Sequence, residues 1–434
     1  MDRVLTKNFG LPDSHTIEVY EKSGGYQSLQ KALSMTPEQA IDETKRSGLR
    51  GRGGAGFPAG MKWGFVPQNT GKPIYLCVNA DESEPGTFKD RALLEKDPHR
   101  LIEGTIIAAY AIRAKAAYIY IRGEFDLPRR RLEQAIAEAT QKGRLGELKI
   151  FVHRGAGAYI CGEETALIES LEGKRGYPRI KPPFPAVQGL FGSPTVVNNV
   201  ETLSAIPYIF EKGAEAYKKM GTEQSPGTKL FSVCGPVAKP GVFEVELGTP
   251  MRKFLTEEVG WMKPGKVLKA VIPGGSSVPV LNAQEVEQVN LDYESMQKNG
   301  SLLGSGGMIV IDEETCMVRA LANLAHFYSH ESCGQCSPCR EGTGWANKVL
   351  QRMEKGDAKP GDIELLLDIG KKMTGTTICV LADSLAMPIA SYIAKFREEF
   401  EAHVQGSCEI CKPKIGLGPS SARGLGPSEA LPEI

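Results

Sequence analysis

Three cysteines stand close enough in the sequence to bind one inorganic cluster. They form the run Cys333-Gly-Gln-Cys336-Ser-Pro-Cys339, with two residues between neighbouring cysteines. Thiolates at this spacing can hold three corners of a four-iron cubane, and the fourth ligand must then come from elsewhere. Cys379 is the obvious fourth ligand. We therefore predict a [4Fe–4S] cluster held by Cys333, Cys336, Cys339 and Cys379.

Two other interpretations of these cysteines remain: a structural zinc site and reduced thiols in the core. Zinc usually pairs two Cys-x2-Cys knuckles, and three cysteines in one tight run suit it poorly. A further pair, Cys408-Glu-Ile-Cys411, lies near the end of the sequence and could be half of a metal knuckle. Because no second pair lies nearby in the sequence, we assign this pair no function.

A first glycine-rich loop has the pattern of a phosphate-binding turn. The run Gly51-Arg52-Gly53-Gly54-Ala55-Gly56 matches G-x-G-x-x-G, a weak signal when it stands alone. It follows a helix-like segment and not a strand, so it is not a dinucleotide-binding βαβ turn. Arg52 and Lys62 nevertheless place cations beside backbone N–H groups that glycines leave open, and this combination suits phosphate oxygens.

Aromatic side chains surround the same loop. The rings of Phe57, Trp63 and Phe65 could stack on a purine or a flavin. A position in the hydrophobic core is the alternative, and we prefer it for Trp63.

A second glycine-rich loop, Gly155-Ala-Gly-Ala-Tyr-Ile-Cys-Gly-Glu-Glu164, follows a predicted strand that ends near His153. A helix is predicted to start at about Glu163. Strand, glycine turn and helix suit a phosphate or a cofactor edge at the helix N-terminus. Glu163 and Glu164 could also simply favour the helix start through its dipole.

The segment Asn79-Ala-Asp-Glu-Ser-Glu-Pro-Gly86 carries three carboxylates directly after a predicted buried strand. Ligand sites of α/β proteins lie at such strand ends, although an acidic turn is the common alternative. Carboxylates with an amide and a hydroxyl suit ribose and ribityl hydroxyls and a flavin edge. Asn198, Asn199 and Thr202 form another polar group before an apolar helix.

The elements that must position these loops alternate between helix and strand. Helices are predicted over Thr36–Arg46, Arg100–Lys115 and Leu127–Lys142, and strands over Ile74–Asn79, Ala117–Arg122 and Leu148–His153. Thr36 with Gln39 forms a capping-box pattern. This alternation predicts an α/β layer with a mostly parallel sheet.

The later part of the sequence changes character twice. Short strand-like runs, Lys229–Cys234, Gly241–Val245 and Val267–Ile272, predict a small β-rich module. Helical patterns over Cys316–Ser329, Glu341–Lys355, Ile363–Met373 and Leu381–Phe400 predict a four-helix bundle. We expect an α/β domain over 1–222, the β-rich module over 223–312, the bundle over 313–405 and a disordered tail over 406–434.

Composition excludes several functional classes. Lys plus Arg equals Asp plus Glu, at 52 each, which argues against a nucleic-acid or anionic-membrane binder. No stretch approaches the roughly 20 apolar residues needed to span a bilayer, and no signal peptide is visible. No Ser-His-Asp or H-E-x-x-H pattern supports a hydrolase. We expect a cytoplasmic protein that reaches a membrane only through partners.

Four blocks together resemble a known family. Gly51–Pro58, Asn79–Gly86, Gly155–Glu164 and Glu331–Gly342 look like the signature blocks of the NADH-binding flavoprotein subunit of respiratory complex I, NADH:quinone oxidoreductase. The resemblance extends from about Gly24 to Phe400. It implies an FMN- and NADH-binding α/β domain, a ubiquitin-like β-grasp module and a helical bundle that carries the cluster.

The resemblance also assigns roles to residues. Glu84 and Glu164 would shape the nicotinamide pocket, and Phe57, Phe65 and Phe184 would stack around the adenine. The residues implied to bind FMN or NADH are Gly51, Arg52, Gly53, Gly54, Ala55, Phe57, Lys62, Phe65, Asn79, Asp81, Glu82, Ser83, Tyr159, Gly162, Glu163, Lys181, Phe184, Asn198, Asn199 and Thr202.

The implied activity is hydride transfer from NADH to FMN, followed by single-electron transfer to the cluster. The implied partners are the thioredoxin-like [2Fe–2S] subunit and the large multi-cluster subunit of complex I, on the inner face of the plasma membrane. One alternative is the diaphorase subunit of a soluble NAD-linked hydrogenase, formate dehydrogenase or bifurcating complex. An alternative of another class is a non-enzymatic iron–sulfur or zinc scaffold.

Overall fold

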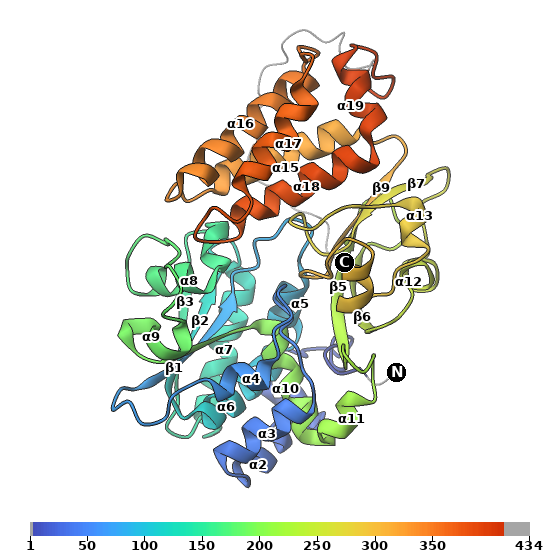
Figure 1. Cartoon of the computed structure of the whole chain (residues 1–434). Coiled ribbons are helices and arrows are strands. Elements are labelled where there is room, and N and C mark those ends of the chain that lie inside the picture. The colour runs from blue at the N-terminus through green and yellow to red at the C-terminus, as the bar shows by residue number, and fades with distance from the viewer. Residues whose placement is uncertain (1–2, 412–434) are drawn as a thin grey trace.

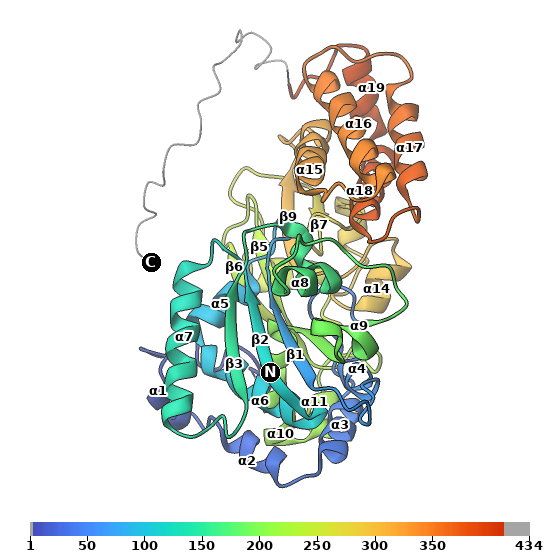
Figure 2. The same cartoon turned by 90° about the vertical axis from the view of Figure 1, so that its left-hand side faces the viewer.

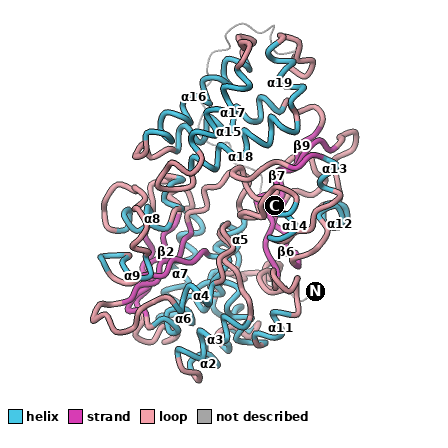
Figure 3. Tube along the Cα trace, in the orientation of Figure 1, coloured by secondary structure: helices cyan, strands magenta, loops and turns pink. Residues whose placement is uncertain are grey.

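The computed structural model describes residues 3–411 of the 434-residue chain. Figure 1 shows three regions: an α/β domain that holds the N-terminal half, a second sheet beside it, and a helical bundle packed above both. Figure 3 shows the strands confined to the first two regions. Residues 412–434, most of the predicted disordered tail, lie outside the described residues.

The first sheet has four parallel strands in the order β3-β2-β1-β4. Its strands are β1 (Ile74–Ala80), β2 (Ala114–Ile121), β3 (Lys149–Arg154) and β4 (Thr195–Asn199). The last of these was not predicted as a strand. Because β1 pairs with both β2 and β4, the acidic segment that follows β1 leaves from the middle of the sheet.

Eleven α-helices of the described residues belong to this domain. They are α1 (Ile17–Lys22), α2 (Gln27–Leu33), α3 (Pro37–Arg46), α4 (Ala59–Gly64), α5 (Lys89–Lys96), α6 (Pro98–Ile112), α7 (Asp126–Gln141), α8 (Glu164–Leu171), α9 (Pro185–Gln188), α10 (Val200–Lys212) and α11 (Ala214–Lys218). Two 3₁₀ turns, η1 (Tyr159–Gly162) and η2 (Leu190–Gly192), complete it.

The two faces of this sheet enter different cores. Leu76 and Val78 of β1 pack in one core with α6, α7 and α10, whereas Cys77 between them packs in another with α8. Successive side chains of a strand point to opposite faces, so both faces of this one are buried. Figure 1 shows α8 and α9 on one side of the sheet and α6, α7 and α10 on the other.

Local signals position the first glycine loop. The predicted capping box starts α3, because Gln39 N donates to Thr36 Oγ1 at 3.3 Å and Thr36 N donates to Gln39 Oε1 at 2.8 Å. The backbone then leaves α3 and forms the loop before entering α4. This order, helix to loop to helix, agrees with the prediction that the loop is not a βαβ turn.

The second sheet is mixed, in the order β6-β5-β9-β7-β8, with β5 and β9 parallel near its centre. Its elements are β5 (Thr228–Cys234), β6 (Gly241–Glu246), β7 (Leu268–Ile272), β8 (Leu281–Asn282), β9 (Gly307–Asp312), α12 (Met251–Glu257), α13 (Ala283–Val286) and α14 (Tyr293–Lys298). This module has its own hydrophobic core, which includes Phe231, Phe254 and Val271.

The bundle contains five helices within residues 3–411 where we predicted four. They are α15 (Met317–Glu331), α16 (Ser337–Glu354), α17 (Asp362–Met373), α18 (Leu381–Lys395) and α19 (Arg397–Val404). The last predicted helix is divided at Phe396, whose φ of −131° and ψ of 31° are not helical. In the view of Figure 2 the five helices lie together at the end of the molecule opposite α2 and α3.

The predicted fold class is confirmed: an α/β domain, a β-grasp module and a C-terminal helical bundle. No helix within residues 3–411 combines the length and apolar character needed to cross a bilayer.

Candidate functional site

A cleft of about 680 Å³ opens where all three regions meet. It lies at the carboxyl ends of β1 and β4, where ligand sites of parallel sheets are expected. The residues lining it that the sequence predicted are Gly53, Gly54, Ala55, Asn79, Asp81, Glu82, Ser83, Glu84, Tyr159, Gly162, Glu163, Asn199 and Cys379.

Strand pairing brings two predicted asparagines together. Asn79 of β1 lies in register with Asn199 of β4. Asn79 Nδ2 donates to the carbonyl of Gly162 at 2.8 Å and so joins the second glycine loop to the sheet. Asn199 donates to Asp90 Oδ2 at 2.6 Å, and its Oδ1 accepts from Glu201 N at 2.9 Å as the cap of α10. Both amides hold segments of the cleft wall in place.

Asp81 carries a buried oxygen without a partner. Its Oδ1 accepts from Ser83 Oγ at 3.2 Å, whereas Oδ2 has no hydrogen-bond partner among the described residues. Burial raises the pKa of this carboxyl to about 7, against the opposing effect of the Ser83 hydroxyl. A buried acceptor of this kind is costly unless a donor meets it. Asp81 therefore lines the cleft with one of its buried carboxyl oxygens left unpaired.

Glu84 joins the α/β domain to the second sheet. Its Oε1 accepts from Ser277 N at 2.8 Å and from Ser276 Oγ at 3.3 Å, and its Oε2 accepts from Tyr159 Oη at 2.7 Å. Burial raises the pKa of Glu84, and these donors limit the rise. The carboxylate is thus held in one orientation at the cleft wall.

Two other predicted acids cap helices. Glu82 accepts from the backbone N–H groups of Asp90 and Arg91 at 2.8 and 2.9 Å, at the start of α5. Burial, together with the charge of Asp90, raises the pKa of Glu82 to about 7. Glu163 accepts from the N–H groups of Thr165 and Ala166 at the start of α8. Both acids line the cleft while performing these structural roles.

Four charged residues form a connected series at the edge of the site. Lys62 Nζ lies 2.8 Å from Glu164 Oε2, and Lys181 Nζ lies 3.6 Å from Glu164 Oε1. Lys181 also pairs with Glu163 at 2.8 Å. Burial alone would raise the pKa of Glu164, but the two ammonium groups lower it below its ordinary value. Glu164 is therefore an anion that joins the helix after the first loop to the segment before α9.

The predicted stacking residues lie on the surface. Phe57, Phe65 and Phe184 are 47%, 56% and 59% exposed, and the first two rings are 6.0 Å apart. Large exposed apolar side chains that gather near charged residues are typical of ligand or protein contact sites. Trp63 is instead fully buried, and its Nε1 donates to Asn198 Oδ1 at 2.8 Å. The core interpretation of Trp63 is confirmed.

Arg52 points away from the cleft. Only 1% of it is exposed, and its guanidinium donates to Tyr217 Oη at 3.1 Å and to the carbonyl of Pro226 at 2.9 Å. Its backbone N–H donates to Thr202 Oγ1 at 2.8 Å. In this conformation the side chain anchors the base of the loop. The Arg52 guanidinium, which we expected to bind a phosphate at the glycine loop, therefore does not face the cleft.

The four predicted cluster ligands surround one small cavity. Cys333, Cys336, Cys339 and Cys379 all line it. Ile378 N donates to Cys336 Sγ at 3.4 Å, and Ser332 Oγ lies 3.3 Å from Cys339 Sγ. No three of these sulfurs, all within the described residues, lie within 4.8 Å of one another as the ligands of a single ion would. The donor set and its wider spacing fit a polynuclear cluster better than one ion.

The cleft and the cysteine cavity share a wall. Ile160, Cys379 and Leu381 line both. Cys379 is the remote ligand that the sequence placed outside the main cysteine run. The structure therefore puts the predicted cluster directly beside the polar cleft.

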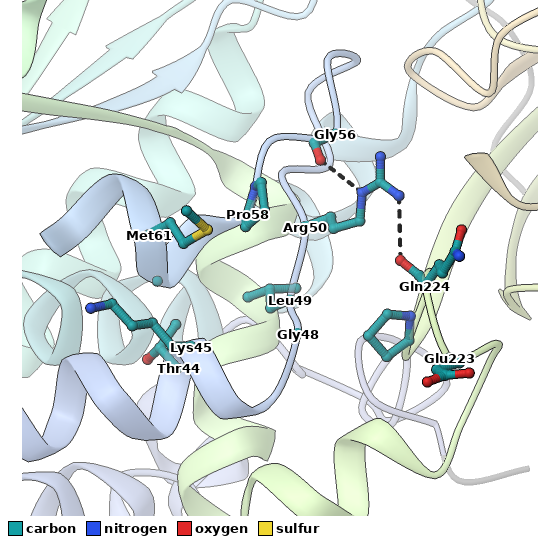
Figure 4. Close-up of a pocket in the computed structure, with 12 residues that line it drawn as sticks. Thr44, Lys45, Gly48, Leu49, Arg50, Gly56, Pro58, Met61, Glu223 and Gln224 are labelled. Atoms are coloured by element: carbon teal, nitrogen blue, oxygen red, sulfur yellow. Dashed lines mark hydrogen bonds between the residues drawn. The ribbon is translucent and has the colours of Figure 1, made fainter. Parts of the chain in front are cut away.

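A separate cavity of about 370 Å³ lies behind the first glycine loop (Figure 4). Arg50 Nε donates to the carbonyl of Gly56 at 2.8 Å and Nη1 donates to that of Gln224 at 3.3 Å. The guanidinium also pairs with Glu294 and lies 3.9 Å from the Tyr293 ring centroid. Of the twelve residues drawn there, only Gly56 belongs to the first glycine-rich loop, and none is among the residues implied to bind FMN or NADH. Arg50 thus fastens the loop to the second sheet.

The second and third modules also line the cleft, and apart from Cys379 none of their lining residues was predicted from the sequence. Gly274, Ser277, Leu303 and Ser305 come from the β-grasp module, and Val380 and Asp383 come from the bundle. A signal existed for the first group, because Pro273-Gly-Gly-Ser-Ser277 follows β7 and resembles the other glycine-rich turns. Nothing in the local sequence marks the bundle residues.

Comparisons with family models divide the sequence as the fold does. Residues 44–208 match the Nuo51 FMN-binding domain, residues 229–311 match the SLBB domain, and residues 319–403 match the NADH-ubiquinone oxidoreductase-F iron-sulfur binding region.

Known proteins resemble this one over nearly its full length. It is 52% identical to the F-type subunit (F 2) of NADH-quinone oxidoreductase in Rhizobium meliloti, over 93% of this chain and 97% of that protein. It is 51% identical to the F-type subunit of NADH-quinone oxidoreductase in Streptomyces coelicolor, over 93% and 91%. A crystal structure of an NAD⁺-reducing [NiFe]-hydrogenase is similar with a TM-score of 0.82 and 38% identity, over 93% of this chain and 67% of that one. This chain belongs to the family of F-type subunits of NADH-quinone oxidoreductase.

Proposed function

We propose that this protein oxidises NADH at an FMN bound in the polar cleft and passes the electrons singly to a [4Fe–4S] cluster held by Cys333, Cys336, Cys339 and Cys379. Bound FMN supplies an acceptor for the hydride that can release electrons one at a time, which suits a cluster that accepts single electrons. The observation that carries the proposal is the wall, with Cys379 in it, shared by the cleft and the cysteine cavity.

The cleft suits a flavin mononucleotide in two respects. Asp81 Oδ2 is a buried acceptor without a partner among the described residues, and flavin offers ring N–H and ribityl O–H donors. The first glycine loop also lies very close to the end of β4, because a Cβ at Gly53 would lie only 3.1 Å from Asn199 Cβ. Gly54 has φ +136°, a backbone conformation that residues with a side chain rarely adopt. Backbone N–H groups of such a loop can bind the phosphate.

Several other predicted residues would serve NADH. Lys62 and Lys181 supply positive charge, and the exposed rings of Phe57, Phe65 and Phe184 supply faces for the adenine. Glu84 and Glu164 would shape the nicotinamide pocket. Each is oriented by its own partners, so the protein contributes positioning and charge without a side-chain nucleophile.

The names of the relatives place this protein in a multi-subunit assembly. We propose a thioredoxin-like [2Fe–2S] subunit and a large multi-cluster subunit as its partners. Through them the protein would attach peripherally to the cytoplasmic face of the plasma membrane. Copurification from the membrane fraction tests this, and material that carries neither subunit there would contradict it.

A diaphorase subunit of a soluble NAD-linked machine is the second candidate. The similarity to the NAD⁺-reducing hydrogenase favours it, because a TM-score of 0.82 shows that the same fold occurs in such an enzyme. Both candidates use the same NADH oxidation and differ in the acceptor that follows the cluster. Copurifying subunits would distinguish them: a hydrogenase subunit would support the second candidate and exclude the first.

The first experiment is an anaerobic titration with NADH of the protein purified with its neighbouring subunit. We expect about one FMN and about four irons per chain beyond the partner's own iron, with bleaching of the flavin absorption by NADH. If the protein binds no flavin after FMN has been supplied, it is a metal-bearing scaffold without this activity, and the proposal is overturned.

A further inference from the structure

A second cluster of metal-ligating side chains lies in the bundle, apart from the four cysteines discussed above. Cys316, His403, Cys408 and Cys411 place one sulfur or nitrogen atom each within 4.8 Å of all the others. Their exposed fractions are only 3%, 5%, 8% and 2%. Four buried ligand atoms at this spacing are the arrangement of a single-ion site.

The distances fit zinc. In a tetrahedral site with Zn–S near 2.3 Å and Zn–N near 2.0 Å, neighbouring ligand atoms lie roughly 3.5–3.8 Å apart. His403 Nε2 lies 3.6 Å from Cys316 Sγ and 3.6 Å from Cys411 Sγ. All ten cysteines of the sequence are free, so no disulfide occupies these sulfurs.

The histidine is oriented for metal binding. His403 Nδ1 lies 2.8 Å from the carbonyl oxygen of Glu399, one turn earlier in α19. A carbonyl can only accept a hydrogen bond, so Nδ1 carries the proton and Nε2 keeps its lone pair. Metal-bound histidines characteristically donate their other ring N–H to a carbonyl or carboxylate in this way.

The backbone after α19 turns the last two cysteines toward the histidine. Gly406 N donates to the carbonyl of His403 at 3.2 Å, and Ser407 N donates to that of Ala402 at 2.8 Å. Gly406 has φ +68°, so this is a Schellman ending that reverses the backbone. Cys411 N then donates to the carbonyl of Cys408 at 3.3 Å, which closes the Cys-x2-Cys turn.

We propose that Cys316, His403, Cys408 and Cys411 bind one structural Zn²⁺ ion, which fastens the end of α19 to the start of α15. Cys316 lies just after β9, so the ion also secures the junction between the β-grasp module and the bundle. Four protein ligands leave no open position for substrate, which makes the site structural. The sequence showed no second cysteine pair near Cys408 and Cys411. In the fold, His403 of α19 and Cys316, which lies 92 residues before Cys408, supply the other two ligands.

Surrounding polar contacts support the ligands. The Glu399 carboxylate accepts from Met317 N at 2.9 Å and pairs with Lys269 of β7 at 2.5 Å. Arg319, one turn after Cys316, pairs with Glu354 at 2.7 Å and also lies near enough to interact with the charges of Cys316 and Cys411. Three thiolates on a divalent ion leave one net negative charge, which this guanidinium helps to balance.

The test is the metal content of the full-length protein, purified anaerobically without added zinc and dialysed against a chelator. We expect about one zinc per chain in addition to the cluster iron. Replacement of the ion with Co²⁺ should give the thiolate charge-transfer and visible d–d bands of a tetrahedral site. Three results would overturn the proposal. The protein could contain no zinc, it could contain a disulfide among these cysteines, or the chelator could remove the ion without any change in the stability of the protein.

Variants locate the ion. Cys408→Ser and His403→Gln should lose at least about nine-tenths of the zinc, whereas His403→Cys should retain it because zinc also accepts four cysteines. Cys234→Ser is the matched control, since Cys234 is a half-buried cysteine of β5 outside both groups. If the ligand variants fail to fold, the zinc content and cobalt spectrum of the unchanged protein still decide the matter.

The zinc site does not depend on the proposed activity. Cys379→Ser should lose iron and keep zinc, whereas Cys408→Ser should lose zinc and keep flavin. Loss of zinc in Cys379→Ser with zinc retained in Cys408→Ser would show that the metal belongs to the cluster site, and would overturn the proposal.

Discussion

Asp81 and Glu84 lie three residues apart in the segment after β1, yet the protein stabilises their charges differently. Glu84 receives hydrogen bonds on both oxygens, from Tyr159 and from the β-grasp module. Asp81 receives one, and its other oxygen is buried without a partner among the described residues. Burial raises the pKa of both, but only Asp81 is left to be satisfied by a ligand.

Stability of the flavin-free protein should therefore depend on Asp81 and pH. The pKa of Asp81 is about 7 in the folded protein and near 4 when unfolded, so the folded state binds the proton more tightly. The resulting stabilisation is fully present below about pH 4 and is lost as the pH rises to about 7, at up to about 1.4 kcal/mol per pH unit. Urea unfolding of flavin-free protein between pH 5 and 8 measures it. Asp81→Asn should make the dependence shallower but leave a slope, because the pKa of Glu82 is also raised to about 7. An unchanged slope in Asp81→Asn would contradict this assignment.

Glu84→Gln should weaken NADH binding while leaving the cluster intact. A charged acceptor contributes about 1 kcal/mol more to a hydrogen bond than a neutral one, so we expect KM for NADH to rise about threefold to tenfold. Steady-state kinetics and iron content measure the two effects. Glu133→Gln, at a half-exposed position on α7, is the control. Unchanged KM and kcat in Glu84→Gln would show that this carboxylate does not shape the nicotinamide pocket.

At the scale of elements, the first glycine loop depends on its close approach to the end of β4. A Cβ at Gly53 would lie 3.1 Å from Asn199 Cβ, and Asn199 is itself held by Asp90 and by the start of α10. Gly53→Ala should therefore displace the loop and reduce FMN occupancy several-fold, with iron unchanged. FMN released by denaturation measures this. Gly10→Ala is the control, because nothing lies within 4 Å of its Cβ; equal FMN in both variants would contradict the argument.

Strong local signals made several elements predictable. Thr36 with Gln39 predicted the start of α3, and the apolar run from Ile74 predicted β1. The strand β4 was missed because two of its five residues, Asn198 and Asn199, are polar and were interpreted only as part of a polar group before an apolar helix. Its strand character comes from pairing with β1, a tertiary contact that no local pattern reports.

The candidate site was predictable only in part for the same reason. Motifs marked the loops and the cysteines, but not the direction of each side chain. Arg52 stands in the middle of a phosphate-binding pattern, and the structure turns its guanidinium toward Tyr217. Cys316 and His403 carry no motif at all, and only the fold brings them to Cys408 and Cys411.

At the scale of the whole molecule, one hydrophobic core contacts both the cleft and the cysteine cavity. Cys77 and Val197 of the first sheet, Ile160 beside the second loop, and Leu385 of α18 belong to the same buried cluster. The cleft is also closed by the β-grasp module through Glu84 and Ser277. The three modules therefore form one working unit, in which no single module supplies a complete cleft.

This arrangement predicts that the two half-reactions can be separated at Cys379. Serine is a poor iron ligand, so Cys379→Ser should lose most of the iron. The cleft keeps its other walls, and NADH should still bleach the flavin, whereas the low-temperature EPR signal of the NADH-reduced cluster should disappear. Cys339→Ser should behave alike, because Cys339 lines the cysteine cavity without lining the cleft. Full iron and an unchanged EPR signal in both variants would show that Cys379 and Cys339 do not hold the cluster. Flavin loss in Cys379→Ser alone would show that Cys379 supports the cleft as well as the cluster.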